Sequence, residues 1–568
     1  CGSDREQCSE TKGDSDPMGM ISTISTNVKA AFGGLSFGLS RRDAVRSDVP
    51  EMEGWNPPAG FGGTMSQGDI ETLFGRARDL DENNGWINGG LDRRVEAVVG
   101  GQIKLRAQPA YEVLGRDNAW RMAWGATTQA RFRVWSEDID RRCDVRMKLT
   151  FGAMVKLAYL SYLRDGEAVA EIQDHWRGMS NPTSVLLFEP ERICTPTHMQ
   201  ESKLLRNGIV FDENGAAIGA WVRSCHLSDP DPKAERYRWD YVPMRDAATG
   251  RAKLLHVFSP RRAEQNRGIS KLAEAMVPAK MLDRVDRAEV QAALQSAIMS
   301  FFIKSPARPD DLEQALAPAT AAGDAVFTPY QKTYLDMREK KPVRLAGAQV
   351  TQLLPDEDVV IPNAARPNAN YPDFARFVLQ KIAGVLGVSS PQLSQDWQGI
   401  NYSSARAMLN EIWRSFVEDR HFFTQAFCTP IYAAWLYWEV ANGDVKIPGG
   451  PSAFIKNKTA VCMAEWIGPG RGSVDPQKEA NANNLDIAAG RKSTVEAILE
   501  TGRDPIDIMD EEAWLMAERD LRNLAPLNHN VKADTASADN ADSAGTETDR
   551  DGDGIPNEDQ KKKQRTKV

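Results

Sequence analysis

The chain has few cysteines, and their spacing is not that of a metal or disulfide framework. The cysteines are odd in number and include no CxxC pair, and the six histidines form no HxH or HExxH motif. Such usage is typical of a reduced intracellular protein, so we expect neither a cofactor nor a thiolate metal site. The seven cysteines are Cys1, Cys8, Cys143, Cys194, Cys225, Cys428 and Cys462.

Long apolar runs are also lacking. The most apolar stretch, around residues 296–303, is far shorter than the ~20 residues that span a bilayer, so we expect no membrane partner. No signal-peptide pattern is present at the start. Because the first residue is Cys1 instead of Met, we expect the true start to be missing or processed.

An excess of positive charge is missing as well. The formal net charge is −9, with 41% hydrophobic and 26% charged residues, which is ordinary for a globular protein. A protein that grips nucleic acid through a large basic surface needs many phosphate-neutralising lysines and arginines, and this balance argues against it. A length of 568 residues predicts two or more structural units.

Catalytic and nucleotide-binding motifs are not apparent, and we predict a protein that is not an enzyme. The glycine-rich Gly468–Ser473 lacks the GxxxxGK(S/T) spacing and its lysine, so a structural turn is expected. The adjacent Cys225 and His226 would form a nucleophile–base pair only by accident of the fold. Asp283, Asp286 and Glu289 alternate with arginines along one segment, which favours helix-surface ion pairs over a metal site.

The last part of the chain, from about Val531, is low in complexity and is expected to be disordered. Asp549, Asp551 and Asp553 match the first ligand positions of a calcium loop, but Gln560 stands where a bidentate Glu is needed. A solvated acidic tail is therefore the default interpretation. The basic Lys561–Lys567 is interpreted as a solubilising end, with binding to nucleic acid or membrane as the alternative.

What the chain does have is a polar loop that runs directly into a strongly amphipathic helix, at Gly387–Val417. Apolar residues recur at three- and four-residue spacing and predict one buried helical face. Asn401, Ser403 and Ser404 offer side-chain oxygens to cap the first free amides. Trp397 lies among Gln, Asp, Ser and Gly, and is either a lid on a local cluster or a contact residue. The apolar positions are Ala405, Met408, Leu409, Ile412, Trp413, Phe416 and Val417.

Elsewhere the pattern is helical from 67 to 170, rich in short strands from 166 to 260, and helical again at the C-terminal end. Asp212–Gly215 (DENG) is a hairpin signature between two strands. The expected long helices are Ser270–Ile303 and Tyr371–Leu386. The expected strands are Glu167–Ile172, Val185–Phe188, Gly208–Phe211, Ala217–Val222 and Leu254–Phe258.

Several segments, in this order, resemble the lambda-like portal proteins of tailed bacteriophages. The resemblance covers roughly residues 65–525, and its most specific parts are Phe377–Gly387 and Gly399–Arg406 (GINYSSAR). The other matching segments are Arg76–Leu80 with Asn83-Asn84, Leu187–Arg192 with Thr195-Pro196, Asn207–Ile209 with Asp212–Gly215, His256–Phe258 with Gln265–Ile269, and Trp466–Gly470 with Asp475–Ala480.

The resemblance implies an α+β portal fold that forms rings, typically of twelve subunits, with a mixed α/β wing, long stem helices, a clip and a helical crown. It implies these units: a flexible arm at 1–65, the wing at 66–269, a stem helix at 270–303, the clip at 304–370, the second stem helix at 371–386, the tunnel loop and tunnel helix at 387–420, a C-terminal wing or crown region at 421–530, and the tail at 531–568.

By the same resemblance the ring is the conduit for DNA packaging and ejection at the unique capsid vertex, in the virion and, during assembly, in the host cytoplasm. Implied partners are further copies of the chain, the major capsid protein, the terminase large subunit, the head–tail connector and double-stranded DNA that passes without sequence readout. The tunnel-loop candidates are Ser394, Gln395, Asp396, Trp397, Gln398, Asn401 and Tyr402. The ring-packing stem candidates are Ala292, Ala293, Ser296, Ala297 and Ser300. A head–tail adaptor ring is the nearer alternative, and a phage nuclease or maturation protease is the enzymatic one.

Overall fold

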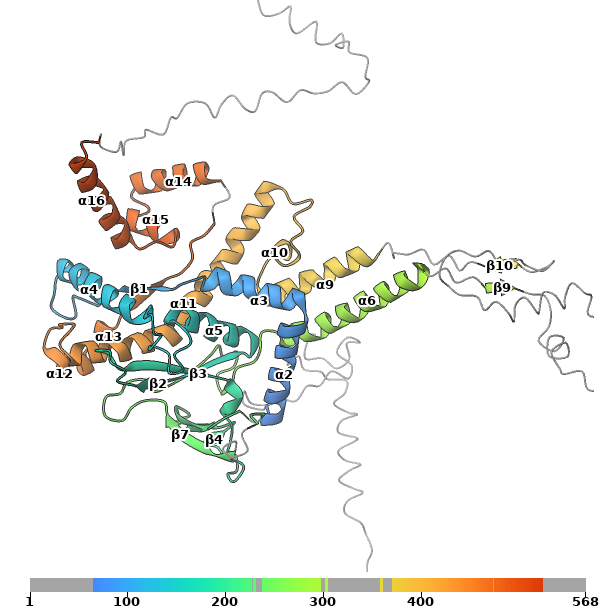
Figure 1. Cartoon of the computed structure of the whole chain (residues 1–568), viewed down its shortest axis with the longest axis horizontal. Helices are drawn as coiled ribbons and strands as arrows, with labels where there is room; N and C mark the ends of the chain where they lie inside the picture. Colours follow the sequence, from blue (N-terminus) through green and yellow to red (C-terminus); the bar gives the residue numbers. More distant parts are fainter. Residues whose placement is uncertain are drawn as a thin grey trace, which may run out of the picture. The chain divides into compact units, whose positions relative to one another are not determined.

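The computed structural model describes residues 65–226, 228–230, 237–297, 302–304, 358–360, 370–472 and 475–524 (Figure 1). The predicted N-terminal arm, nearly all of the predicted clip and the C-terminal tail lie outside these residues. So do Ser300 and the calcium candidates Asp549, Asp551 and Asp553. Within the described residues, no helix combines the length and apolarity needed to cross a bilayer.

Two helices joined by one residue begin the described part: α2 (Gln67–Asn83) and α3 (Gly85–Val98). Ser66 starts α2 with a capping box, because its hydroxyl accepts from the Asp69 amide while the Asp69 carboxylate accepts from the Ser66 amide. Asn84 ends α2 in an extended conformation and caps α3 through the Ile87 amide at 3.0 Å. Both helices lie within the stretch from 67 to 170, where the pattern is helical.

The next helices are α4 (Asn118–Ser136) and α5 (Phe151–Arg164). Asp117 and Thr150 cap their first turns. The apolar residues of helix α5 join the larger core together with the aromatic residues of α4. This core is dominated by rings that meet edge-on, such as Phe132 against Trp435, whose centroids lie 5.1 Å apart.

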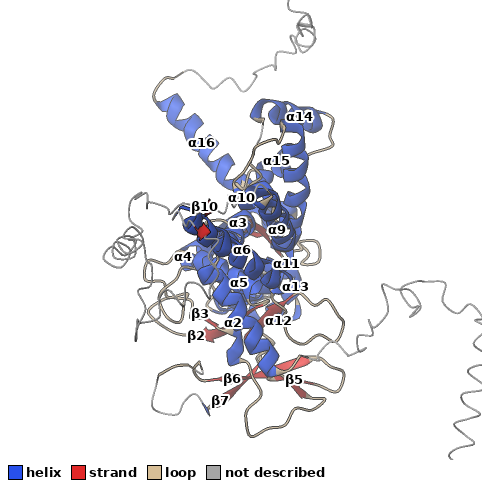
Figure 2. Cartoon of the chain, turned by 90° about the vertical axis from the view of Figure 1, so that its right-hand side faces the viewer, coloured by secondary structure: helices blue, strands red, loops and turns tan. Residues whose placement is uncertain are grey.

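Two antiparallel sheets follow. The first has the order β3-β2-β8, from β2 (Glu167–Asp174), β3 (Thr183–Phe188) and β8 (Leu254–Phe258). Helix α5 packs on β2, and the second sheet lies on the other side of the first (Figure 2). A separate small core that includes Val169 and Val222 joins the two sheets. The second sheet has the order β4-β5-β6-β7, from β4 (Leu205–Arg206), β5 (Ile209–Phe211), β6 (Ala217–Arg223) and β7 (Trp239–Pro243).

The predicted strands are present, and the predicted hairpin joins β5 to β6. Asp212 accepts from the amides of Asn214 and Ala216, and Gly215 takes a φ of 87°. Strand β7 was not predicted. Neither was the pairing of β1 (Lys104–Ala107) with β11 (Ala464–Ile467), two short strands separated by most of the chain.

Helices α6 (Ala273–Ala297) and α9 (Tyr371–Leu386) pack against each other along the chain's two predicted stem segments. Between them, β9 (Phe302–Lys304) pairs with β10 (Asp358–Val360). The bounds of α9 coincide with the predicted ones. Pro278 lies within the second turn of α6, where it removes one backbone hydrogen bond without ending the helix.

Helix α10 (Ser390–Ser394) and the 40-residue helix α11 (Tyr402–Ala441) come next. The predicted boundary at 420/421 falls inside α11, so two expected helices are one. The residues around this point are good helix formers, and the later Pro430 removes a single backbone hydrogen bond without ending the helix. The remaining helices are α12 (Gly450–Lys456), α13 (Lys458–Val461), α14 (Pro476–Ala488), α15 (Thr494–Glu500) and α16 (Pro505–Leu521).

Candidate functional site

The loop that precedes α11 has a buried base. Gly387 ends α9 with a φ of 66°, the left-handed conformation that glycine adopts most readily. An added Cβ there would overlap the guanidinium of Arg94, whose Nη1 donates to the Leu386 carbonyl at 2.6 Å. Val388 and Leu393 are buried beneath α3, and Ser389 caps α10 with a capping box that includes Gln392. The base is therefore fixed by packing and by capping.

The tip of the loop, residues 395–400, is mostly exposed but locally ordered by its own hydrogen bonds. Gln395 has a φ of 57°, and its side-chain amide donates to the Gln392 carbonyl at 3.0 Å. Asp396 accepts from the Gln398 amide at 3.0 Å, while its own amide donates to Ser394 Oγ at 3.2 Å. These side-chain-to-backbone bonds are those of compact turns, so the tip has a defined shape.

The predicted tunnel-loop residues divide between this tip and its two edges. Ser394 is half-buried at the end of α10, and Trp397 is 44% exposed, which favours the contact interpretation over the lid. Asn401 caps α11 by accepting from the Ser404 amide at 2.8 Å, so its side chain has a structural task. Tyr402 is the first residue of α11. Their roles in DNA contact stay predictions.

Below the loop, one carboxylate joins four parts of the chain. Asp419 of α11 pairs with Arg94 of α3, accepts from the Tyr159 hydroxyl of α5 at 3.1 Å, and lies 3.2 Å from Lys271 Nζ, just before α6. We call Arg94, Tyr159, Lys271 and Asp419 the Asp419 node. Arg94 also donates to the Leu386 carbonyl at the base of the loop. The node therefore connects the loop base to α6 and α11, and to α5, the helix that packs on the first sheet.

Electrostatics keep this node charged. Burial alone would raise the pKa of the Asp419 carboxyl, but the charges of Arg94 and Lys271 outweigh burial and lower it. Burial and the adjacent Arg94 lower the pKa of the Lys271 ammonium. One carboxylate thus serves two cations. The role of Asp419 was not predicted, although Asp419 lies three residues after Phe416 and four before Phe423, on the helix face that both buried rings define.

The apolar face predicted for the start of α11 is only partly a core. Phe416 is buried, while Ala405, Met408, Leu409, Ile412 and Trp413 are half-buried. Val417 is 45% exposed, so its assignment to the core is wrong within one chain. The first turns of α11 project beyond the elements that cover its later part, and they therefore lack neighbours.

The predicted ring-packing residues lie at the far end of α6. Ala292 is half-buried and Ala293 is exposed, whereas Ser296 and Ala297 continue the helix and only their backbone is described. The interpretation of Asp283 and Asp286 as members of surface ion pairs is wrong. Asp283 accepts from Asn84 Nδ2 at 2.8 Å, and Asp286 accepts from the Tyr371 hydroxyl, so they join α6 to its neighbours.

The Gly468–Ser473 segment is a packed turn as far as it is described, to Gly472. An added Cβ on Gly468 would overlap the Arg420 guanidinium, and one on Gly470 would overlap the backbone of Thr501. Arg420 donates to the carbonyls of Ala97, Val98 and Pro469 and has no acidic partner among the described residues. Burial lowers the pKa of Arg420 to about 10. The two glycines are therefore needed for close packing, as expected for a structural turn.

A second buried charge network fixes the segment that leads into α6. Arg267 pairs with Glu167 and also donates to the carbonyls of Pro190, Ile193 and Asn207, while His256 Nε2 lies 2.6 Å from Glu167. Burial alone would raise the pKa of Glu167, but the charges of Arg267 and His256 outweigh it and lower the pKa to about 2. The entry into α6 is thus tied to β2 and to the second sheet.

Among the described residues, Glu189, Glu191 and His226 bring their ligand atoms close enough to hold a metal ion. The sequence spacing gave no sign of this cluster, because the fold brings the two segments together. Both oxygens of Glu191 accept from Arg78, and the His226 nitrogen that faces the glutamates, Nε2, lies 2.7 Å from Glu191 Oε1. These bonds occupy the donor atoms in an ion-pair network. Cys225 has no part in it, so the nucleophile–base arrangement with His226 does not form.

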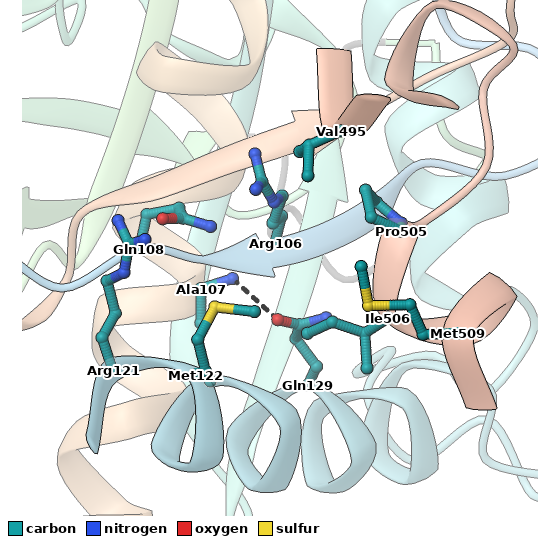
Figure 3. A pocket seen from close by; sticks show the side chains of 11 residues that line it. Arg106, Ala107, Gln108, Arg121, Met122, Gln129, Val495, Pro505, Ile506 and Met509 are labelled. Carbon is teal, nitrogen blue, oxygen red and sulfur yellow. Dashed lines mark hydrogen bonds between the residues drawn. The ribbon is translucent and has the colours of Figure 1, made fainter. Parts of the chain in front are cut away.

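The C-terminal helices are anchored on α4 and β1 (Figure 3). Gln129 connects the two sides, because its oxygen accepts from the Ala107 amide at 3.3 Å and its nitrogen donates to Asp504 at 2.8 Å. Asp507 lies 3.1 Å from Arg133 and 3.3 Å from Lys104. A small hollow remains beside these bonds, lined by Arg106, Met122 and Met509.

The chain is similar in sequence to known proteins over most of its length. A family model described as phage portal protein, lambda family, matches residues 49–420. The portal protein of Escherichia phage N15 is 27% identical over 481 residues, which cover 84% of this chain and 89% of that protein. Portal protein B of Escherichia phage lambda gives the same identity and coverage. Among solved structures, a chain in the neck of an empty GTA particle has a TM-score of 0.41 at 14% identity, covering 81% of this chain and 94% of that one.

Proposed function

The chain belongs to the lambda family of phage portal proteins, and on this premise we propose that copies of it form a ring at the unique vertex of a phage capsid and conduct double-stranded DNA. The observation that carries the proposal is the loop at 387–401. It presents an exposed tip on a buried base, at the end of a 40-residue helix. A conduit needs such a part, because moving DNA must meet a surface that keeps its shape.

The chemistry of the tip suits contact without sequence readout. Its exposed side chains are Gln395, Asp396, Trp397 and Gln398, none of which is cationic. Amide groups bond to phosphate and sugar equally well in any sequence, and an aromatic ring packs against the backbone without reading base edges. The net charge of −9 adds repulsion between the ring and the phosphates, so DNA would slide instead of being held.

The proposal includes the partners that a portal vertex requires. These are about a dozen copies of the chain, the major capsid protein, the terminase large subunit and the head–tail connector. Assembly would take place in the host cytoplasm before the ring becomes part of the virion. The support is the family membership.

The test removes the tip and leaves its base. Deleting Gln395–Gly399 in the full chain should leave rings visible by electron microscopy and should reduce the yield of DNA-filled heads, because the tip adds little to the fold. Trp397→Ala should lower the yield to a smaller extent. Trp176→Ala is the matched control, since Trp176 is 59% exposed on another part of the protein, and it should not affect packaging.

Two results would overturn the proposal. Wild-type protein that stays monomeric under all assembly conditions would refute the ring. If the deletion left rings intact and the yield of DNA-filled heads unchanged, or if it abolished assembly while any rings that formed still packaged DNA, the loop would have been given the wrong task.

A further inference from the structure

Helices α6 and α9 run antiparallel. Contacts at both ends fix the position of each helix relative to the other along the helix axis, which we call its level. At the inner end, Lys271 before α6 and the Leu386 carbonyl of α9 both meet the Asp419 node. At the outer end, Tyr371 of α9 bonds to Asp286 of α6. Counting inward from this bond, Arg284 lies level with Asp373, and Met281 lies level with Arg376, within one residue of Phe377, since both helices rise 1.5 Å per residue.

One face of α6 remains uncovered. Lys280 and Asp283 face α2, through Asp79 and Asn84, and Asp286 faces α9. Val277, Met281 and Arg284, at spacings of four and three, share the side that neither neighbour covers. Val277 is 67% exposed and Met281 is 54% exposed. Arg284 is exposed and has no ion pair within the described chain. We call these three residues the Val277 face.

A different uncovered face lies on α9. Its buried residues, Val378, Leu379, Ile382, Ala383 and Leu386, point to the rest of the protein. Asp373, Phe374 and Phe377 share the opposite sector of the helix, and we call them the Phe377 face. Phe377 is 67% exposed, which is unusual for a large aromatic ring on a helix with its own core. Asp373 is exposed, and its partner among the described residues is Arg376, one turn away, at 3.3 Å.

We propose that the Phe377 face of one copy of this chain packs on the Val277 face of the next copy, with Phe377 against Met281 and Asp373 beside Arg284. The proposal rests on the ring proposed above and names the contact that builds it. The two faces complement each other at equal levels, aromatic against thioether and carboxylate against guanidinium. Rotation about a ring axis that runs parallel to α6 and α9 does not shift a neighbouring copy along these helices. Phe377 and Asp373 of one copy therefore meet Met281 and Arg284 of the next.

The two faces also explain why a ring results. A dimer with twofold symmetry uses the same surface on both partners, whereas here each copy carries one face of each kind. Such a head-to-tail contact leaves one face free at each end of any open chain, until rotation brings the last copy to the first. The contact is distinct from the small residues at 292–300, which lie farther out along α6.

The test is covalent. In the full chain, Met281→Cys together with Phe377→Cys should give, on mild oxidation of assembled protein, a ladder of linked species that continues beyond the dimer. Each single variant should give the same pattern as wild-type protein with its seven native cysteines, since a single added cysteine has no second introduced cysteine facing it. If wild-type rings form but the double variant gives no species beyond the dimer, this contact is wrong while the ring stands. If no rings form, both proposals fall.

A charge exchange provides the second measurement. Arg284→Asp and Asp373→Arg should each raise the protein concentration needed for ring assembly by about tenfold or more, because like charges would meet at every contact. The combined variant should restore assembly. Arg287→Asp makes the same charge change on another side of α6 and should assemble like the wild type. Failure of the combined variant to improve on the single ones would refute the pairing of Arg284 with Asp373.

Discussion

At the scale of single residues, Gly387 sets the direction of the loop because it has no side chain. Its positive φ turns the chain out of α9, and its missing Cβ leaves room for the Arg94 guanidinium that holds the last carbonyl of the helix. The direction of the loop and the position of a buried charge are therefore decided at the same place.

Gly387→Ala should destabilise the protein by at least about 2 kcal/mol, because an alanine with positive φ costs about 1–2 kcal/mol and its Cβ would displace Arg94. The measurement is urea unfolding of unassembled protein. Gly384→Ala is the matched control: Gly384 is one turn earlier, helical, and open on its side, so this change should add about 0.5–1 kcal/mol of stability. Equal effects of the two substitutions would contradict the role given to the turn.

Two structural tasks of single side chains differ in how far the sequence reveals them. Asn401 could be predicted as a cap, because caps depend on local sequence. Asp419 could not be assigned its partners, since Arg94, Tyr159 and Lys271 come from segments distant in the chain. Its place on an apolar helix face was the available signal, and the interpretation of that face as purely apolar left it out.

At the scale of elements, the Asp419 node determines whether α3, α5, α6 and α11 move separately or together. Each of these elements contributes one group, directly or, for α6, through the residue just before it, and Asp419 is the only acid among the four groups. Removal of that acid would leave two cations with little compensation in a largely buried place.

Asp419→Asn should lower the free energy of unfolding by about 2–4 kcal/mol, less than for a fully buried pair because part of the site is solvated. Faster hydrogen exchange at the start of α11 should accompany this loss. Glu418→Gln, an exposed change one residue earlier on the same helix, should stay within about 0.5 kcal/mol of the wild type. Loss of stability without any change in exchange near residues 402–419 would argue against coupling to the loop.

Regular elements were largely predictable, and the reason is local. The hairpin at 212–215, strand β8 and helix α9 follow from turn chemistry and periodicity within a few residues. The β1–β11 pair was missed because two four-residue strands carry almost no periodic signal until they meet. The continuity of α11 across residues 420 and 421 was not predicted, because the boundary between two expected functional regions was taken as the end of a helix.

At the scale of the whole molecule, the Glu167 network makes stability depend on pH. The pKa of Glu167 in the folded state is about 2, below the ~4.3 of an unperturbed glutamate. A lowered folded-state pKa contributes stability above the unfolded pKa, and this contribution is lost as pH falls towards the folded one. The window for this group is therefore between about pH 4.5 and 2.

Thermal unfolding across that window should show the wild type losing about 3 kcal/mol through this group. Glu167→Gln should be less stable at neutral pH, since Arg267 loses its buried partner, and should lose less on acidification. Glu418→Gln should keep the wild-type dependence. If Glu167→Gln lost stability with acid as steeply as the wild type, the network would not be the source of the effect.

The continuous course of α11 has a mechanical consequence. A helix of 40 residues is about 60 Å long, and this one begins at the loop tip and ends among the rings around Trp435. A helix that continues through Pro430 without ending can pass a push at one end along its length. The Asp419 node holds α11 at a point between its two ends, so the helix can tilt about this point. Any thrust of moving DNA on the tip would be passed on as a small tilt of the aromatic core.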